Sequence, residues 1–182
     1  MKNAGTKRLE TDRLILRRFV IEDADEMYNN WANDDEVTKY LTWPTHNSVD
    51  VTKYILNGWI EKYKNDNFYN WAIVLKETGQ VIGNISVVEL REDIESAIVG
   101  YCMSRSLWGQ GIMPEALGEV IAFLFDEVGL NRVAAEHDVN NPKSGRVMQK
   151  AGMRFDGILR QAGRNNQGII DVAWYSVLKD EV

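Results

Sequence analysis

The stretch that decides the fold lies at residues 107–116 and reads Leu107-Trp108-Gly109-Gln110-Gly111-Ile112-Met113-Pro114-Glu115-Ala116. The apolar run 97–103 before it predicts a strand, and apolar residues along one helical face between Leu117 and Val128 predict a helix after it. Gly109 and Gly111 allow the intervening turn to adopt backbone conformations that other residues avoid. Free amides and the positive end of the helix dipole would then face an anion. The stretch therefore predicts a site for a ligand that contains a diphosphate.

Two familiar phosphate-binding motifs are excluded by particular residues. The P-loop requires Lys followed by Ser or Thr after its last glycine, and this chain has Ile112-Met113 there. The dinucleotide-binding fingerprint requires a third glycine three residues after Gly111, where the chain has Pro114. On these residues alone, a tight turn with a purely structural role stays open.

Length and composition limit the class of protein. The 182 residues predict one domain, residues 9–182, after a flexible segment of residues 1–8. Hydrophobic residues make up 45% and charged residues 26%, as in an ordinary soluble protein, and no apolar run reaches the length of a membrane helix. Cys102 is the only cysteine, which excludes an intrachain disulfide and a cysteine-based zinc cluster. Because the polar N-terminus also lacks a signal peptide, we expect a cytoplasmic protein with no membrane partner and no metal.

The charge balance bears on possible ligands. The formal net charge of −6, from 21 basic and 27 acidic residues, argues against general nucleic-acid binding, which requires a basic face. A negative field attracts cations, so the charge is compatible with a cationic substrate such as an amine.

The hydrophobic pattern predicts an alternation of strands and helices. Strands are predicted at 14–19, 71–75, 81–88, 97–103, 132–138, 153–159 and 169–178. Helices are predicted near 24–31, from the N-cap Ser48 to about residue 63, from the glycine turn to about 128, and at 143–151. The apolar face of the second helix would comprise Val51, Tyr54, Ile55, Trp59 and Tyr63. The order β-α-α-β-β-β-α-β-α-β-β indicates an α+β fold, with a central mixed sheet of about seven strands flanked by about four helices.

A second motif follows about 30 residues after the glycine turn and reads Asn141-Pro142-Lys143-Ser144-Gly145-Arg146-Val147-Met148-Gln149-Lys150-Ala151-Gly152-Met153. Together, the two motifs resemble the GNAT superfamily of N-acetyltransferases, specifically its RimJ/RimL-type ribosomal-protein N-terminal acetyltransferases. The second motif of that family runs N-x-x-S-x-x-V-L-E-K-x-G-F. The family's opening T-x-R-L-x-L-R resembles residues 11–17, and its closing G-x-x-x-D-x-x-x-Y-S resembles residues 168–176. The resemblance therefore spans roughly residues 9 to 180.

The resemblance implies the GNAT fold and acetyl-CoA as the co-substrate. In the family, the glycine loop holds the pyrophosphate through backbone amides. The strand before it pairs with the pantetheine arm and splays from the parallel strand 132–138, so that the thioester enters the gap. The cofactor-binding residues that follow from this are Met103, Ser104, Trp108, Gly109, Gln110, Gly111, Ile112, Met113, Asn141, Ser144 and Arg146. Ser106 departs from the wider superfamily, which has Arg or Gln three residues before the first glycine.

The chemistry implied is direct attack of an amine on a thioester. It requires a neutral amine, a donor to the developing oxyanion and a proton for the departing thiolate. The resemblance favours Ser144 as the partner of the thiolate and a backbone N–H near Met103 as the oxyanion donor. Glu136 is the predicted base, or a ligand for the substrate ammonium, because it shares a strand face with Ala134, near which relatives often carry glutamate. Glu89 and His137 are further candidates, and a water relay could replace all three.

The sequence thus predicts an acetyl-CoA-dependent N-acetyltransferase for a primary amine. The amine would be a protein N-terminal α-amine or a small amine such as a polyamine, an amino-sugar or a drug. A non-catalytic CoA-binding sensor is an alternative from a different class. The acceptor pocket would lie between the two N-terminal helices, the loop 42–47 and the final hairpin, where Asp171 and Tyr175 could line it. The protein is expected to be a monomer or a homodimer.

Overall fold

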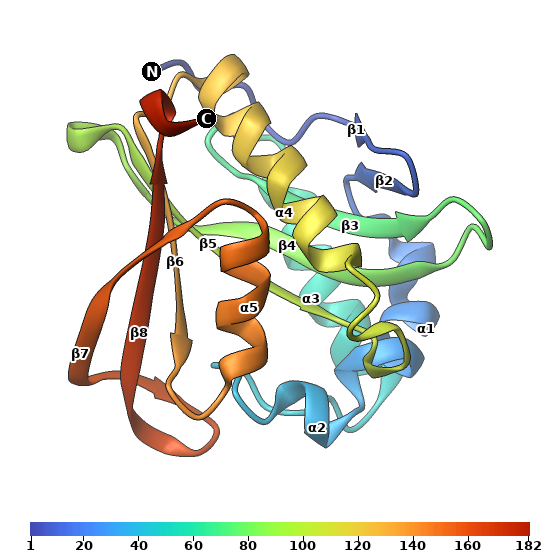
Figure 1. The fold of residues 1–182 in the computed structure, drawn as a ribbon. Helices are drawn as coiled ribbons and strands as arrows, with labels where there is room; N and C mark the ends of the chain where they lie inside the picture. Colours follow the sequence, from blue (N-terminus) through green and yellow to red (C-terminus); the bar gives the residue numbers. More distant parts are fainter.

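The computed structural model describes all residues from 1 to 182, folded around one mixed sheet (Figure 1). The spatial order of its eight strands is β1-β2-β3-β4-β5-β6-β8-β7. The strands are β1 (Leu9–Glu10), β2 (Leu14–Arg17), β3 (Asn70–Leu75), β4 (Val81–Arg91), β5 (Ser96–Met103), β6 (Arg132–Asp138), β7 (Arg154–Asn165) and β8 (Gly168–Leu178). The helices are α1 (Ala24–Met27), α2 (Asp35–Thr38), α3 (Val49–Lys62), α4 (Ile112–Phe123) and α5 (Pro142–Lys150).

The α+β class and the predicted order of the main elements are confirmed. The structure adds the strand β1 and the helix α2, which are 2 and 4 residues long. Each segment spans only about one period of its hydrophobic pattern, which is too short for the pattern to repeat, so the sequence did not indicate them. None of the helices has the length and apolar content needed to span a bilayer.

Helices cover both faces of the sheet, as Figure 1 shows. The core beneath α4 and α5 contains Trp71 and Ile73 of β3, whereas the core beneath α1 and α3 contains Ala72 and Val74. Because successive strand residues point to opposite faces, one buried strand supplies both cores.

The buried face of α3 differs from the predicted one. Thr52 and Leu56 are fully buried, but Tyr54 is 78% exposed and Val51 lies at the surface. The Thr52 hydroxyl is 2.8 Å from Nδ1 of His46, and this hydrogen bond makes a polar residue suitable for the buried position. Because the prediction used apolar residues alone, it assigned the buried face of α3 to the wrong side of the helix in its first two turns.

The N-terminal segment makes contacts with the rest of the chain. The Lys2 amide donates to the Val128 carbonyl at 2.7 Å, and the Thr6 hydroxyl donates to the Phe68 carbonyl at 2.9 Å. Thr6 is only 3% exposed. The division into a flexible segment 1–8 and a domain 9–182 stays a prediction, although these contacts hold residues 2–6 against the fold.

The parallel pair β5 and β6 separates soon after it begins. Its register contains three pairs, Ser96↔Arg132, Ala97↔Val133 and Ile98↔Ala134. Beyond them β5 continues along β4 as far as Met103, while β6 continues along β8 as far as Asp138. The sheet is therefore open between residues 99–103 and 135–138, which confirms the expected splay.

Candidate functional site

The glycine loop lies between the end of β5 and the start of α4. Gly109 and Gly111 have φ angles of 82° and 76°, in the left-handed region that favours glycine. Gly111 is the N-cap residue of α4, and no side chain caps that helix. The first amides of α4 are therefore available to an acceptor from outside the helix. The predicted turn and helix start are both confirmed.

The loop is fixed by the opening motif of the chain. Arg13 donates to the Gln110 carbonyl at 3.0 Å and to Oε2 of Glu115 at 2.7 Å. Oε1 of Glu115 also accepts from the Thr11 hydroxyl at 2.5 Å and from the Arg13 amide at 3.1 Å. Burial alone would raise the pKa of Glu115, but the hydrogen bonds from Thr11 and Arg13 and the charge of Arg13 lower it overall. Sequence reasoning found the Thr11 motif without finding what it does, which is to anchor the loop through Glu115.

Trp108 connects the loop to its two neighbours. Its indole Nε1 donates to the Met103 carbonyl at 3.1 Å, and Lys143 of α5 places its Nζ 4.9 Å from the ring centroid. A cation over an indole ring is attracted to it, so this contact joins the loop to the first turn of α5. The two sequence motifs are therefore neighbours in space.

The open edge of β5 presents backbone groups. The Ser104 amide donates to the Ile82 carbonyl on the β4 side at 2.8 Å. Because amides alternate along a strand, the Met103 and Tyr101 amides point to the opposite edge, where β6 has diverged. Ser104 itself is buried, and its Oγ lies 3.0 Å from Oγ of Ser106.

Helix α5 places polar groups beside this edge. Asn141 is its N-cap residue, and its side chain makes no capping hydrogen bond, which leaves the amide free. Arg146 lies on the exposed side of the helix. Ser144, in the first turn, has its Oγ 3.0 Å from the hydroxyl of Tyr101 on β5.

Tyr101 is a residue that sequence reasoning missed. Its hydroxyl also donates to the Ser144 carbonyl at 3.0 Å, so its side chain reaches from β5 to α5. Burial raises the pKa of Tyr101, and the hydrogen bond with Ser144 opposes this only in part. The signal was available, since strand alternation puts Tyr101 on the same face as Val99 and Met103, which belong to the core beneath α4 and α5.

Glu136 lies on the other face of the sheet. Val133 and Ala135 of β6 belong to the core beneath α4 and α5, so Glu136 points to the side of α1 and α3. Partial burial raises the pKa of the Glu136 carboxyl, and the negative charge of Glu89 raises it further. The two carboxylates therefore interact on the side of α1 and α3, beside the opening of the sheet.

His137 does not join these carboxylates. A Cβ on Gly145 of α5 would lie 2.5 Å from its Nε2, so the imidazole packs directly beneath α5. The ring also stacks on Tyr175, with 5.7 Å between the centroids. Tyr175 is buried on this same side, in the core beneath α4 and α5, whereas the sequence predicts it beside the acceptor pocket.

The predicted wall of the acceptor pocket joins segments that are far apart in sequence. The side-chain amide of Asn166, in the turn between β7 and β8, donates to the carbonyls of Thr38 at 2.9 Å and Trp43 at 2.8 Å. Asn165, beside it, donates to Oδ2 of Asp138 at 2.8 Å. Arg105 pairs with Asp34 at 3.0 Å and so connects the glycine loop to the start of α2.

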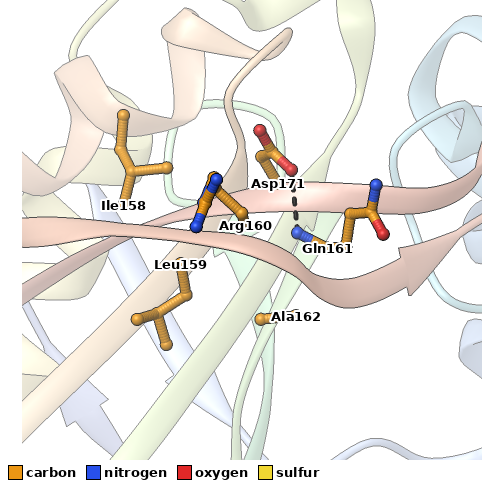
Figure 2. A pocket seen from close by; sticks show the side chains of 6 residues that line it. All are labelled: Ile158, Leu159, Arg160, Gln161, Ala162 and Asp171. Carbon is orange, nitrogen blue, oxygen red and sulfur yellow. Dashed lines mark hydrogen bonds between the residues drawn. The ribbon is translucent and has the colours of Figure 1, made fainter.

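A cavity lies away from these residues. An open cavity of about 770 Å³ is lined by Ile158, Leu159, Arg160, Gln161, Ala162 and Asp171, all from β7 and β8. Figure 2 shows these side chains. It forms where the register between these strands shifts, with Gln161 at a φ of 51° and its amide donating to Asp171 at 2.8 Å. No residue of β5, α5 or the glycine loop lines it, so it is separate from the candidate site. The structure has no cluster of three or more His, Cys, Asp or Glu side chains placed to hold a metal ion.

Comparisons with known proteins agree with this arrangement. The family model "Acetyltransferase (GNAT) domain" matches residues 13–154. "Uncharacterized N-acetyltransferase YoaA" of Bacillus subtilis (strain 168) is 30% identical over 171 residues, which are 94% of this chain and 96% of the relative. "Ribosomal-protein-serine acetyltransferase" of Escherichia coli (strain K12) is 28% identical over 77% of this chain and 78% of the relative.

Solved structures share the fold. Microcin C7 self immunity acetyltransferase MccE, in complex with acetyl-CoA and AMP, superposes with a TM-score of 0.83 at 22% identity, over 92% of this chain and 93% of that one. The family match covers the glycine loop, the open pair β5–β6 and α5, which are the parts that build the site. This chain therefore belongs to the GNAT family of acetyltransferases and is an N-acetyltransferase.

Proposed function

We propose that this enzyme transfers the acetyl group of acetyl-CoA to the N-terminal α-amine of a protein. The observation that carries the proposal is the opening of the sheet after Ile98 and Ala134, with the uncapped glycine loop at one end and Ser144 beside it. A relative named for acetylating a ribosomal protein and a structural neighbour described with acetyl-CoA support it.

The residues present fit a CoA ligand. The amides of residues 109–113, at the start of α4, suit a pyrophosphate, because the glycine conformations expose them and no side chain competes for them. The Met103 and Tyr101 amides on the open edge of β5 suit the amide groups of a pantetheine arm. Asn141 has a free side-chain amide for the same arm, and Arg146 is exposed where it could pair with a phosphate.

The acetyl transfer then needs three groups from this chain. The Met103 amide would donate to the thioester oxygen as negative charge develops there. Ser144 would donate to the sulfur as the carbon–sulfur bond breaks. Glu136 would accept the proton of the attacking amine from the opposite face, and its raised pKa makes it a better base than an ordinary glutamate.

The acidity of the amine favours an α-amine as acceptor. An α-amine has a pKa of about 8, so roughly a tenth is neutral at pH 7, whereas a lysine-type amine has a pKa of about 10.4 and is almost entirely charged. A single glutamate on a half-open face is a sufficient base for the first amine and a poor one for the second. Glu89 beside it gives the face a second negative charge that would attract either ammonium.

Two alternatives give different results in one assay. A small-amine enzyme would have the same cofactor site with another acceptor, and a CoA sensor would bind without turnover. The intact Asn141 and Ser144 disfavour the sensor. A cytoplasmic location and a monomeric or homodimeric state belong to this proposal as expectations.

The test pairs calorimetric titration of acetyl-CoA with thiol release over a panel of acceptors. The panel contains a peptide with a free N-terminal serine or alanine, the same peptide with a blocked N-terminus and an internal lysine, a polyamine and an amino-sugar. We expect binding, turnover on the free peptide and mass-spectrometric evidence of α-acetylation. Turnover only on a small amine would show that the acceptor is a small amine and not a protein N-terminus. Binding without turnover would favour the CoA sensor, and no binding of acetyl-CoA would refute the proposal.

A further inference from the structure

A hydrogen-bonded contact between Tyr101 and Ser144 joins β5 to α5 beside the opening of the sheet. Tyr101 belongs to β5 and Ser144 to the first turn of α5, and the phenolic oxygen is 3.0 Å from both the Oγ and the carbonyl oxygen of Ser144. Tyr101 follows Ile98, the last residue of β5 that pairs with β6, by three positions and so lies at the opening itself. No other hydrogen bond to Oγ of Ser144 is present.

We propose that Tyr101 is a positioning residue for the acetyl transfer, because its hydroxyl orients the Ser144 hydroxyl toward the departing sulfur. The inference deepens the proposed function, on which it rests. Tyr101 touches neither the acetyl group nor the amine in this role and acts through Ser144.

The donors and acceptors allow two arrangements. A tyrosine hydroxyl has one hydrogen and two lone pairs, and so has a serine hydroxyl. In the first arrangement, Tyr101 donates to the Ser144 carbonyl and accepts the Ser144 hydrogen. In the second, Tyr101 donates to Oγ of Ser144, whose own hydrogen is then free to point at the sulfur.

When the Tyr101 hydrogen moves from the Ser144 carbonyl to Oγ of Ser144, the carbonyl still has a hydrogen-bond donor. Ser144 lies in an α-helix, so its carbonyl also accepts the amide hydrogen of the residue four positions later. The carbonyl can therefore lose the Tyr101 hydrogen at little cost. Because burial keeps the Tyr101 phenol neutral, it remains a hydrogen-bond donor throughout the pH range of the enzyme.

The reaction remains balanced with Tyr101 keeping its proton. The nitrogen–carbon bond forms, the carbon–sulfur bond breaks and its electron pair leaves on the sulfur. The proton lost by the nitrogen reaches the sulfur through the base and solvent. During this step Ser144 donates to the sulfur, and Tyr101 donates to Oγ of Ser144, which makes the serine hydrogen a stronger donor.

The first measurement needs no turnover. The ultraviolet absorbance of the thiolate of bound CoA is followed against pH in the wild type, Tyr101→Phe and Tyr175→Phe. We expect the pKa of the bound thiol to be about one unit higher in Tyr101→Phe, since the thiolate loses stabilisation. Tyr175→Phe is the matched control, because its hydroxyl also reaches α5 but contacts Gln149, at 3.5 Å.

The second measurement is kinetic. With acetyl-CoA, we expect Tyr101→Phe to lower kcat about tenfold while the KM for acetyl-CoA changes less than about twofold. With an S-acetyl thiophenol, whose thiolate leaves without help, the loss should fall below about threefold. Adding Tyr101→Phe to Ser144→Ala should cause no further loss, because the two residues act as a unit.

The outcomes separate the inference from the function on which it rests. If the wild type releases no thiol with any acceptor, the proposed function fails and the inference fails with it. If the wild type is active and Tyr101→Phe matches Tyr175→Phe in both measurements, only the inference is overturned. An equal loss with both thioesters would also overturn it, since a general loosening of α5 would not depend on the leaving group.

Discussion

The two sides of the open sheet are held in place by different means. On the proposed cofactor side, the Glu115 carboxylate accepts the hydrogen bonds that join the N-terminal motif to the start of α4. On the proposed acceptor side, the Asn166 side chain, in the turn between β7 and β8, donates to the carbonyls of Thr38 at the end of α2 and of Trp43 after it. The first side depends on a charged cluster and on glycine conformations, whereas the two Asn166 side-chain contacts on the second side are neutral hydrogen bonds.

This difference indicates which property each side controls. Charge-assisted hydrogen bonds contribute more than neutral ones, and a backbone conformation available only to glycine admits little substitution. Changes on the cofactor side should therefore lower acetyl-CoA affinity and stability together. Changes on the acceptor side should alter the acceptor KM alone, and by less.

The largest effect is expected from Glu115→Ala. The free energy of unfolding should fall by about 2 kcal/mol and the dissociation constant for acetyl-CoA should rise about 30-fold, because Arg13 and Thr11 lose their common acceptor. Urea unfolding and calorimetry measure the two quantities. The stability difference from the wild type should narrow as the pH falls through the lowered pKa of Glu115, since the protonated carboxyl no longer pairs with Arg13.

Glu119→Ala is the control for this change. Glu119 lies one turn further along α4 and takes no part in the cluster. It should leave both quantities nearly unchanged. Equal losses in the two variants would show that the helix, and not the cluster, holds the loop.

A smaller effect is expected from Gly111→Ala. A left-handed alanine costs about 1 to 2 kcal/mol, so the loop should relax and the affinity for acetyl-CoA should fall about tenfold. Gly118→Ala, inside the same helix and with no atom within 4 Å of an added Cβ, should stabilise the protein by up to about 1 kcal/mol. A lower melting temperature in Gly111→Ala and a higher one in Gly118→Ala would establish that the backbone conformation at position 111 holds the loop. Retained affinity in Gly111→Ala would contradict this account.

Glu136→Gln tests the proposed base, which lies at the opening of the sheet between the cofactor side and the acceptor side. Because about a tenth of an α-amine is already neutral at pH 7, a base can add at most about tenfold, and we expect kcat/KM to fall about fivefold. In the wild type, kcat/KM should decline as the pH falls through the raised pKa of Glu136. Glu89→Gln should move this decline to lower pH, because it removes the charge that helps to raise the pKa. An unaltered profile in Glu136→Gln would assign proton removal to water.

The same contrast explains what the sequence could predict. The cofactor side was accessible because its determinants are local, namely two glycines before a helical period and the second motif, which begins at Asn141. The sequence places Glu136 on the strand face of Ala134, and the packing of His137 beneath Gly145, on the opposite face, agrees with this alternation. The splay of β5 from β6, which the family resemblance implied, is confirmed by the register.

The acceptor side was largely inaccessible because its determinants are contacts between distant segments. Nothing in the residues around Asn166 indicates that its amide binds carbonyls more than 100 positions earlier in the chain. The partner of Tyr101, likewise, is fixed only when β5 and α5 pack together. On α3, the apolar pattern overlooked Thr52 because a buried polar residue is identified by its partner and not by its hydropathy.

Asn166→Ala tests the acceptor wall directly. Loss of two neutral hydrogen bonds should loosen the segment after α2 and raise the KM for a peptide acceptor about threefold, with acetyl-CoA affinity unchanged. Gln167→Ala is the control, because that side chain makes only a long contact of 3.5 Å with the Lys39 carbonyl. A change in acetyl-CoA affinity would mean that the two sides are coupled, for which the pair Arg105–Asp34 would be the route.

The smallest effect concerns His46, which fixes the same segment from beneath. It is 5% exposed and bonded to Thr52, and burial lowers its pKa below the usual value of 6.5. The folded state therefore keeps His46 neutral, and the unfolded chain takes up more protons as the pH falls below 6.5. The stability that His46 contributes is thus fully present above that pH and is lost as the pH falls toward the lowered pKa. Urea unfolding at a series of pH values should show this decline in the wild type and a flatter curve in His46→Asn, which keeps a hydrogen-bonding group but cannot titrate. Parallel curves would show that another group controls the acid response of the acceptor wall.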